Sequence, residues 1–411
     1  MCLERSRTTT LDVIVDVSGW GPVYLCCTCD ADERGRLLPS ERDPCERHFV
    51  FELLATPEHS KRIRTLKVDF REFYDGERVE LVLGSCRFFA LPFPQLIGLK
   101  WKALRANHSK YTFSHPLFTP TIRSLSFDAR WDDSLKQVDH LTSLTLGSDL
   151  RGADTETLRL FISGNQSLES LSLKYTYFEG NTNAPPANLP NLKSLDLRFC
   201  SKTMSSIVRV PATQRLSSLQ ISLEGLGTHG TVILTATGDG FALSIWVDLN
   251  DVVEVWQGLT QDAQSTIRCV RFCNYTWGRD PADFDSTDGS AVFPLLTDVH
   301  TMEVGRDYLS YWYPGFLDDL KQLGPQLKTI RFELEEDTEP FKDRGDVYGY
   351  WGGKLLDQIE ELVKYRFEHG RPFSVVERMV VRETERDGRQ QDYVWRCFYG
   401  DRGLGQYVRL E

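Results

Sequence analysis

Five short segments repeat one pattern, apolar-x-Ser-Leu-x-apolar, and no other feature of the chain constrains its fold as strongly. The segments are residues 122–127, 141–146, 168–173, 192–197 and 216–221. Their first residues lie 19, 27, 24 and 24 positions apart. Near-even spacing of this length indicates one small structural unit repeated along the chain. We therefore expect a repeat array rather than a single globular core.

Alternation inside each segment predicts how the units stack. In residues 192–197, Leu195 and Leu197 point to one face of a strand, whereas Ser194 and Asp196 point to the other. One unit cannot bury its leucines alone, so neighbouring strands should stack in parallel. The prediction is an α/β fold: an irregular leucine-rich-repeat solenoid with a curved parallel sheet, helices or loops on its outer side and a cap at each end.

Weaker copies of the pattern extend the array toward both ends. They are residues 63–68, 96–101, 267–272, 299–304, 327–332 and 376–381. Leucine-rich repeats usually place Asn or Cys three residues after the last leucine. In the five strong segments only Cys200 fits that place, so the repeats are irregular. Residues 154–162 predict a short helix between two strands, because Leu158 and Phe161 lie on one helical face.

Three parts are expected along the chain. Residues 1–60 should form an N-terminal cap, with a strand at 11–17 and a helix at 43–54 that Asp43 and Pro44 begin. Residues 61–340 should carry the repeats, with a hairpin-like insertion near 225–250. Residues 341–411 should form a C-terminal cap.

Two turn signals support these limits. In the insertion, strands at 231–237 and 241–249 flank Gly238-Asp239-Gly240. In the C-terminal cap, a helix at 355–367 should stop at Gly370 and Pro372, and a strand at 375–381 should follow.

Composition and charge exclude several classes. The net charge is −11, and the 48 Lys and Arg residues are scattered, so nucleic acid is not an expected partner. No apolar run is long enough to span a membrane, and the start of the chain lacks a signal core. The ten cysteines are then expected to be reduced thiols in a cytoplasmic or nuclear protein. For the same reason, the glycosylation triplets at Asn107, Asn165 and Asn274 are interpreted as chance matches. The acidic run 333–339 is interpreted as a solvated loop, because charge runs of this kind are more often solvated than functional.

A family resemblance rests on four stretches of the chain. They are residues 3–6 followed by 11–16, the helix at 49–54 leading through His59 to 63–66, and residues 189–195. The chain resembles here the leucine-rich-repeat region of the large F-box family of mushroom-type fungi, over most of its length. The resemblance implies that a repeat domain selects a substrate while an F-box docks on Skp1 and a cullin ubiquitin ligase. No segment here supplies an F-box, so Skp1 is an expected partner only if one lies upstream of Met1.

The motifs that could carry chemistry are weak. Residues 225–230 match G-x-G-x-x-G, but the β-branched residues after them predict a strand where a dinucleotide site needs a helix. Cys26, Cys29, Cys45 and His48 could hold zinc, but a strand points residues i and i+3 to opposite faces. No catalytic motif occurs. We therefore expect no enzyme activity, no cofactor and no metal; the alternatives are an enzyme whose site is assembled from distant residues, or a scaffold unrelated to ubiquitination.

The residues between and after the inward leucines form the predicted binding surface for a protein partner. They are Lys67, Lys100, Lys102, Asp128, Lys174, Asp196, Arg198, Arg271 and Arg331. Seven of these nine side chains are positive although the chain is acidic, so the expected partner has an acidic surface. An equally simple interpretation is that they only keep the sheet soluble. Aromatic clusters near Trp312 and Trp351 could be either core or interface.

Overall fold

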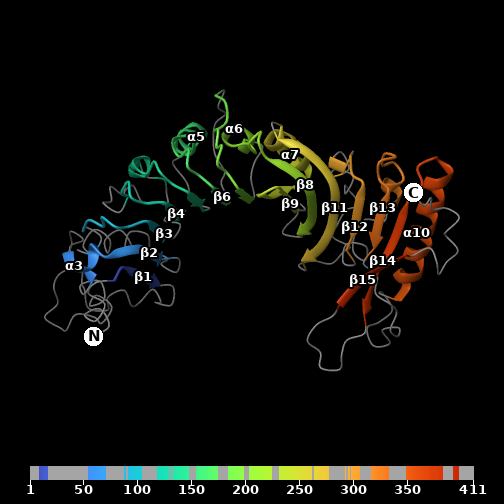
Figure 1. Ribbon diagram of the computed structural model, residues 1–411, viewed down its shortest axis with the longest axis horizontal. Coiled ribbons are helices and arrows are strands. Elements are labelled where there is room, and N and C mark those ends of the chain that lie inside the picture. The colour runs from blue at the N-terminus through green and yellow to red at the C-terminus, as the bar shows by residue number, and fades with distance from the viewer. Residues whose placement is uncertain are drawn as a thin grey trace, which may run out of the picture. The chain divides into compact units, whose positions relative to one another are not determined.

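The computed structural model describes two compact units, Met1–Arg209 and Val210–Glu411. The described residues are 9–16, 54–70, 88, 91–103, 118–128, 131, 133–147, 154–174, 184–198, 203–224, 231–261, 263–276, 292, 295–296, 298–305, 316–332, 349–382 and 392–397. Both units are built mainly from strands, with helices in some of the segments between them (Figure 1).

The described part of the first unit contains seven parallel strands, and each pairs with the next one along the chain. They are β1 (Leu11–Asp16), β2 (Ile63–Phe70), β3 (Gly98–Ala103), β4 (Ser124–Asp128), β5 (Ser143–Leu146), β6 (Ser170–Lys174) and β7 (Ser194–Arg198). Four of the five Ser-Leu segments are thus consecutive neighbours, β4 to β7, as the repeat predicts.

The leucines of these strands form a buried ladder. Leu125, Leu144, Leu171 and Leu195 lie opposite one another in register, and none is more than 1% exposed. Two residues further along each strand, a second row of apolar side chains is also buried. Each fully buried leucine contributes about 2 kcal/mol relative to an exposed one, so the strands are held mainly by their neighbours. The alternation expected from sequence is confirmed.

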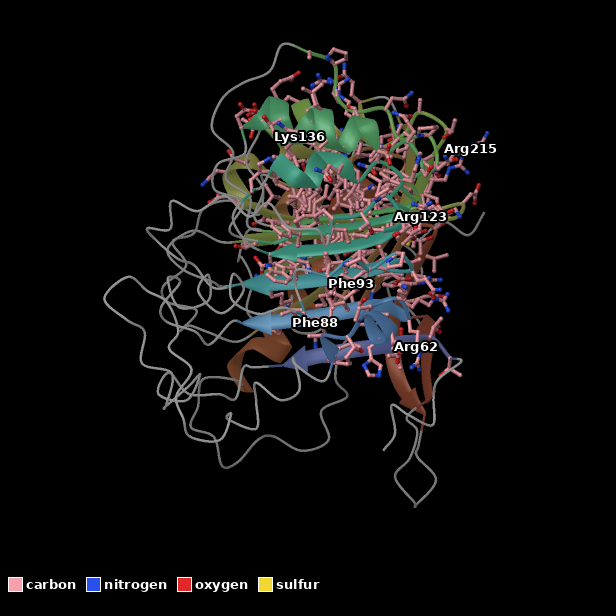
Figure 2. The ribbon with its side chains drawn as sticks, turned by 90° about the vertical axis from the view of Figure 1, so that its left-hand side faces the viewer. Arg62, Phe88, Phe93, Arg123, Lys136 and Arg215 are labelled. Atoms are coloured by element: carbon pink, nitrogen blue, oxygen red, sulfur yellow. The ribbon has the colours of Figure 1, made fainter. Side chains whose placement is uncertain are left out.

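Return segments on one side of the strands carry the helices of the first unit (Figures 1 and 2). Besides the short α3 (Pro57–Ser60), they are η2 (Asp133–Gln137), α5 (Thr155–Gly164) and α6 (Met204–Ile207). The helix predicted at 154–162 is α5, which begins where Asp154 accepts a hydrogen bond from the Thr157 amide at 2.6 Å. This bond lowers the pKa of Asp154, and α5 buries Leu158, Phe161 and Ile162.

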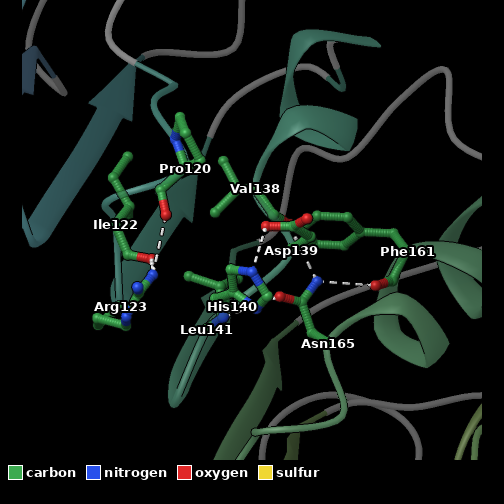
Figure 3. Close-up of polar contacts among 9 residues, drawn as sticks. All are labelled: Pro120, Ile122, Arg123, Val138, Asp139, His140, Leu141, Phe161 and Asn165. Carbon is green, nitrogen blue, oxygen red and sulfur yellow. Dashed lines mark hydrogen bonds and ion pairs between the residues drawn. The ribbon is translucent and has the colours of Figure 1, made fainter.

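Asn165 fastens the end of α5 to the strand before it (Figure 3). Its Oδ1 accepts from the Leu141 amide at 2.9 Å, and its Nδ2 donates to the carbonyls of Phe161 and Val138 at 2.9 and 3.2 Å. The side chain is 1% exposed and its amide is fully used. Asn165 is therefore a structural residue, and its buried, hydrogen-bonded amide supports the interpretation of its glycosylation triplet as a chance match.

The second unit begins with an antiparallel meander. Its strands are β8 (Arg215–Glu224), β9 (Thr231–Gly238) and β10 (Phe241–Asp248). Gly240 has φ +76°, a conformation that glycine adopts readily, so the expected hairpin turn is confirmed. The segment after the glycine motif is the strand β9, as predicted. Next come η3 (Leu249–Asp251) and α7 (Val252–Thr260).

Parallel strands then resume. They are β11 (Gln264–Thr276), β12 (Thr301–Val304), β13 (Thr329–Phe332) and β14 (Val375–Arg382), with β15 (Asp392–Cys397) antiparallel to β14. The helices α9 (Phe316–Leu320) and α10 (Gly349–Glu368) lie between them in sequence. The C-terminal helix begins at Gly349, six residues before its predicted start. Its stop at Gly370, where φ is +72°, and the strand after it are as predicted.

Two details of the repeat prediction are wrong. The fifth Ser-Leu segment, in β8, does not extend the ladder of β4 to β7, because its two edges pair with β9 and β11. The copy expected at 376–381 is shifted by three residues: Val376 lies opposite Ile330, so Phe373 takes the first apolar place. Apolar residues at both 376 and 379 fit the pattern, and only pairing with β13 selects between them.

Several predictions fall outside the described residues. These are the helix at 43–54 except for Leu54, the zinc candidates Cys26, Cys29, Cys45 and His48, residue Cys200, the glycine motif 225–230, the triplet at Asn107 and the acidic run 333–339. The same holds for Trp312 and for the side chain of Trp351. They stay predictions, as do the expected limits of the caps.

Candidate protein-binding surface

The face of the first unit opposite its buried ladder is lined by residues that alternate with the inward side chains. A middle row lies between the two inward residues of each strand: Lys67, Lys100, Ser126, Thr145, Ser172 and Asp196. A last row follows the inward residues and includes Asp69, Lys102, Asp128, Lys174 and Arg198. We call these two rows, with the residues that precede the inward pair, the open face of the first unit.

Seven of the nine predicted site residues belong to this face. Lys67, Lys100, Lys102 and Asp128 lie toward β1, and Lys174, Asp196 and Arg198 lie on β6 and β7. The other two, Arg271 and Arg331, lie on β11 and β13 of the second unit.

The β6–β7 end of the open face carries a hydrogen-bonded cluster. Ser172 donates to Asp196 Oδ2 at 3.0 Å, and the Arg198 Nε donates to both carboxylate oxygens at 3.1 and 3.2 Å. Asp196 therefore compensates the charge of Arg198 and holds its side chain in place. Lys174 lies next to Arg198 in register and makes no ion pair with any residue that the structure describes.

Three lysines of the open face have free ammonium groups. Among the residues that the structure describes, no hydrogen bond or ion pair forms at Lys67, Lys102 or Lys174. All three are half-buried, with their aliphatic stems along the sheet. Lys100 sits between Lys67 and Ser126 in register. Within the part of the chain that the structure describes, these three lysines therefore carry positive charge that no hydrogen bond or ion pair neutralises.

On the second unit, charges cancel in a row. Arg271, Glu303, Arg331 and Glu377 lie opposite one another on β11 to β14. Arg331 donates to Glu303 at 2.9 Å and to Glu377 at 2.8 Å. Although burial opposes its charge, these hydrogen bonds raise the pKa of Arg331. Arg331 is thus committed to two carboxylates rather than available to a partner.

Sequence reasoning missed both carboxylates. Glu303 could have been found, because it stands between the inward Met302 and Val304 in a segment that matches the repeat. Glu377 could not, since the expected copy placed it three residues away from its true register.

Metal binding finds no support in the described part of the chain. No group of three or more His, Cys, Asp or Glu side chains there is placed to hold an ion. Burial, and then the charge of Glu303, raises the pKa of the Cys269 thiol on β11, which disfavours the thiolate that metals require.

Parallel strands in repeat register, an inward leucine ladder and return segments on one side define a leucine-rich-repeat solenoid. No family model matches the chain, and no curated protein does. Among solved structures, the leucine-rich repeat-containing protein LegL7 from Legionella pneumophila is similar, with 15% identity over 72% of this chain and 90% of that chain. Its TM-score is 0.28, so the assignment of the fold rests on the strand register and burial described above.

No helix among the described residues has the length and apolarity to cross a bilayer.

Proposed function

We propose that this chain is a non-catalytic protein-interaction module and that it binds its partner through the open face of the first unit. The observation that carries the proposal is the set of free lysines on that face, Lys67, Lys102 and Lys174, in a chain of net charge −11. Charges of one sign on a surface of a protein of the opposite net sign favour an acidic partner and its orientation.

Sheet geometry also supports this face. Parallel strands lie about 4.8 Å apart and present main chain and small side chains between the lysines. Ser126, Thr145 and Ser172 occupy the centre of the middle row. Such side chains leave a partner room to approach, while the lysines at both ends supply specificity. The second unit fits an acidic partner less well, because the charges of Arg331, Glu303 and Glu377 cancel there.

The finer hypothesis is that the partner is a substrate of a ubiquitin ligase. It rests on the sequence resemblance to F-box proteins, in which the repeat domain selects the substrate. A cytoplasmic or nuclear location is part of the same proposal. Its test is to express the chain with its upstream genomic sequence: co-purification of Skp1 with the longer product, and not with residues 1–411, is the expected result. Failure of the longer product to bind Skp1 rejects the ligase role.

The binding face itself is tested by charge reversal. Partners recovered by affinity purification and identified by mass spectrometry are expressed, and their direct affinity is measured against the variant K100E/K174E/R198E. We expect loss of measurable binding with cooperative melting retained, because partly exposed charges on a solvated face contribute only about 1 kcal/mol each to stability. The control is Lys136→Glu, on the helix-bearing side (Figure 2). Equal affinity of the triple variant and the control contradicts the proposed face.

A further inference from the structure

The first strand of the sheet has a free edge. β1 pairs with β2 along one side and is the end strand in the order of the described sheet. The Leu11 amide donates to the carbonyl of Arg62, just before β2, at 2.8 Å. Because successive main-chain groups of a strand point to opposite sides, those of Asp12 and Ile14 point away from β2. No described residue forms a hydrogen bond with them on that side.

The inward side chains of β1 are incompletely covered. Leu11 and Val13 are half-buried, whereas their register partners Ile63 and Leu66 on β2 are no more than 1% exposed. In a repeat array, each strand buries the inward side chains of its neighbours. Among the described strands β1 has a neighbour on one side alone, so one more strand would complete the burial of its inward row.

The outward side chains of β1 show what such a strand should carry. Ile14 is 69% exposed, and Leu160 is the other large apolar side chain that is exposed among the described residues. Asp12 is also exposed, and its carboxylate accepts a hydrogen bond from the Thr65 hydroxyl at 2.6 Å. No described cation pairs with Asp12, and Lys67, opposite Ile14, lies on β2 away from the free edge. Cross-strand pairs are favourable between two apolar side chains and between opposite charges.

We propose that the free edge of β1 binds an extended segment of a protein partner, which adds to the sheet as a further strand. The segment carries an apolar residue, a cation and two apolar residues opposite residues 11–14, in that order if parallel and in reverse if antiparallel. Its main chain pairs with Asp12 and Ile14, and its cation pairs with the Asp12 carboxylate. This edge lies beside the open face and does not depend on its lysines, so the site goes beyond the proposed function.

The composition of β1 supports pairing. Edge strands that avoid further pairing commonly carry Lys, Pro or an inward charge. The strand Leu-Asp-Val-Ile-Val-Asp has no Lys and no Pro, and its inward positions are apolar. These residues leave the edge able to accept another chain.

A second copy of this chain fits the edge less well. Because β1 contains no Lys or Arg, no register between two β1 strands gives Asp12 a counter-charge. An antiparallel pair centred on Asp12 brings two carboxylates together, and a pair centred on Val13 sets Asp12 against Ile14. Both arrangements lack the favourable cross-strand pairs that a cation-bearing segment offers.

The test measures binding of a labelled peptide to the full chain by fluorescence anisotropy. The probe has the core Ile-Val-Arg-Val-Ile between Ser-Gly flanks, and this palindromic core matches residues 11–14 in either direction. We expect saturable binding. An analogue with the same side chains and N-methyl groups on the core residues should bind at least about tenfold more weakly, because it lacks the main-chain donors. Equal binding of the two peptides rejects strand addition.

Exchange of charges locates the peptide on β1. We expect Asp12→Lys to weaken binding of the Arg peptide about fivefold, and a peptide with Glu in place of Arg to restore affinity for that variant. Asp139→Lys, which reverses another exposed carboxylate, is the matched control and should bind the Arg peptide as the unchanged chain does. If Asp12→Lys does not distinguish the Arg and Glu peptides, the assigned contact is wrong.

Proline tests the main-chain pairing. Ile14→Pro removes a donor of the free edge together with the exposed side chain, so binding should fall at least about tenfold. The melting temperature should stay near that of the unchanged chain, because the lost N–H does not pair with β2. Leu160→Ser is the control for loss of an exposed apolar side chain. Undiminished binding by Ile14→Pro overturns the proposal, and if that variant fails to melt cooperatively, the charge exchange at Asp12 decides.

Two further outcomes separate this site from its alternatives. The variant K100E/K174E/R198E should bind the Arg peptide at least as tightly as the unchanged chain, whatever that variant does to an acidic partner. A loss of peptide affinity there as large as in Asp12→Lys would move the peptide to the open face and reject the edge site. Sedimentation of the unchanged chain should show a monomer. A dimer that Ile14→Pro dissociates would assign the edge to a second copy and overturn the proposal.

Discussion

At the scale of single residues, two buried polar side chains form hydrogen bonds with main-chain groups of irregular turns. Asn165 bridges the Leu141 amide to the carbonyls of Val138 and Phe161. Arg366, on α10, donates to the carbonyls of Leu320, Leu323, Gly324 and Leu327 at 3.0 to 3.3 Å. Irregular turns leave buried carbonyls and amides without partners in regular structure, so a side chain must supply them.

Asn165→Ala should destabilise the protein by about 2 kcal/mol, because a buried amide and two carbonyls lose their partner at once. Urea unfolding followed by circular dichroism measures the change. The control is Asn191→Ala, which removes one exposed hydrogen bond to the Gln166 carbonyl and should cost less than about 0.5 kcal/mol. Similar losses for the two variants would show that the Asn165 bridge does not stabilise the fold.

Arg366→Met should cost about 3 kcal/mol. Burial, and secondarily the charge of Arg371, lowers the pKa of Arg366 to about 10, so the group stays protonated at neutral pH and keeps its donors. Methionine retains the length of the side chain but leaves four carbonyls without that donor. Arg371→Met is the matched control, since Arg371 makes only long contacts of 3.4 and 3.5 Å to the same turn. A lower melting temperature for Arg371→Met than for Arg366→Met would contradict this role of Arg366.

At the scale of elements, glycine ends α10, the last helix among the described residues. Gly370 has φ +72° and its amide donates to the Phe367 carbonyl at 3.1 Å, two residues before Pro372. Gly370→Ala should lower stability by about 1 kcal/mol, because alanine is strained in this conformation. Gly164→Ala, at the end of α5, meets no atom within 4 Å and has no positive φ, so it should leave stability unchanged or raise it slightly. Melting temperatures that fall equally for both variants contradict the assignment.

Sequence pattern was enough to predict the elements whose signals are local. Alternation in residues 192–197, the helix at 154–162 and the turn around Gly240 each depend on neighbours in sequence, and each is confirmed. Pairing was harder, because period two tells which face a residue occupies but not which strand lies beside it. Two features that sequence did not predict both depend on strand pairing. One is the meander that pairs with an edge of β8, and the other is the three-residue shift of register at Val376.

Prediction of the binding surface was limited in the same way, because alternation gives the face that a residue occupies but not its neighbours on other strands. The outward positions of the first unit followed from alternation, so seven residues were placed on one face. Glu303 and Glu377 lie 28 and 46 residues from Arg331 in sequence and meet it only through strand register. The predicted copies at 299–304 and 327–332 place Glu303 beside Arg331, whereas the register of Glu377 depends on how β14 pairs with β13. Ile14 was assigned to a strand of the cap, and its exposure on the open face appears only once β1 pairs with β2.

At the scale of the whole molecule, an acidic chain displays cations on one face of one unit. The net charge of −11 keeps long-range attraction to acidic proteins weak, so contact must depend on the local field of the lysines. Affinity for any acidic partner should therefore fall at least about tenfold as salt rises from about 0.05 to about 0.5 M, because screening shortens the reach of exposed charges. Isothermal titration measures it, and salt-independent affinity would point to an apolar interface elsewhere.

The central claim is that each repeat strand turns its leucines inward and its polar residues to an open face. Aspartate placed one position at a time along β6 tests it, with thermal unfolding followed by circular dichroism. Leu171→Asp and Leu173→Asp should abolish cooperative folding, since each buries an unpaired carboxylate in the ladder. Ser170→Asp and Lys174→Asp should melt within a few degrees of the unchanged chain. Cooperative folding of Leu171→Asp and Leu173→Asp, or loss of folding in Ser170→Asp and Lys174→Asp, would contradict the account.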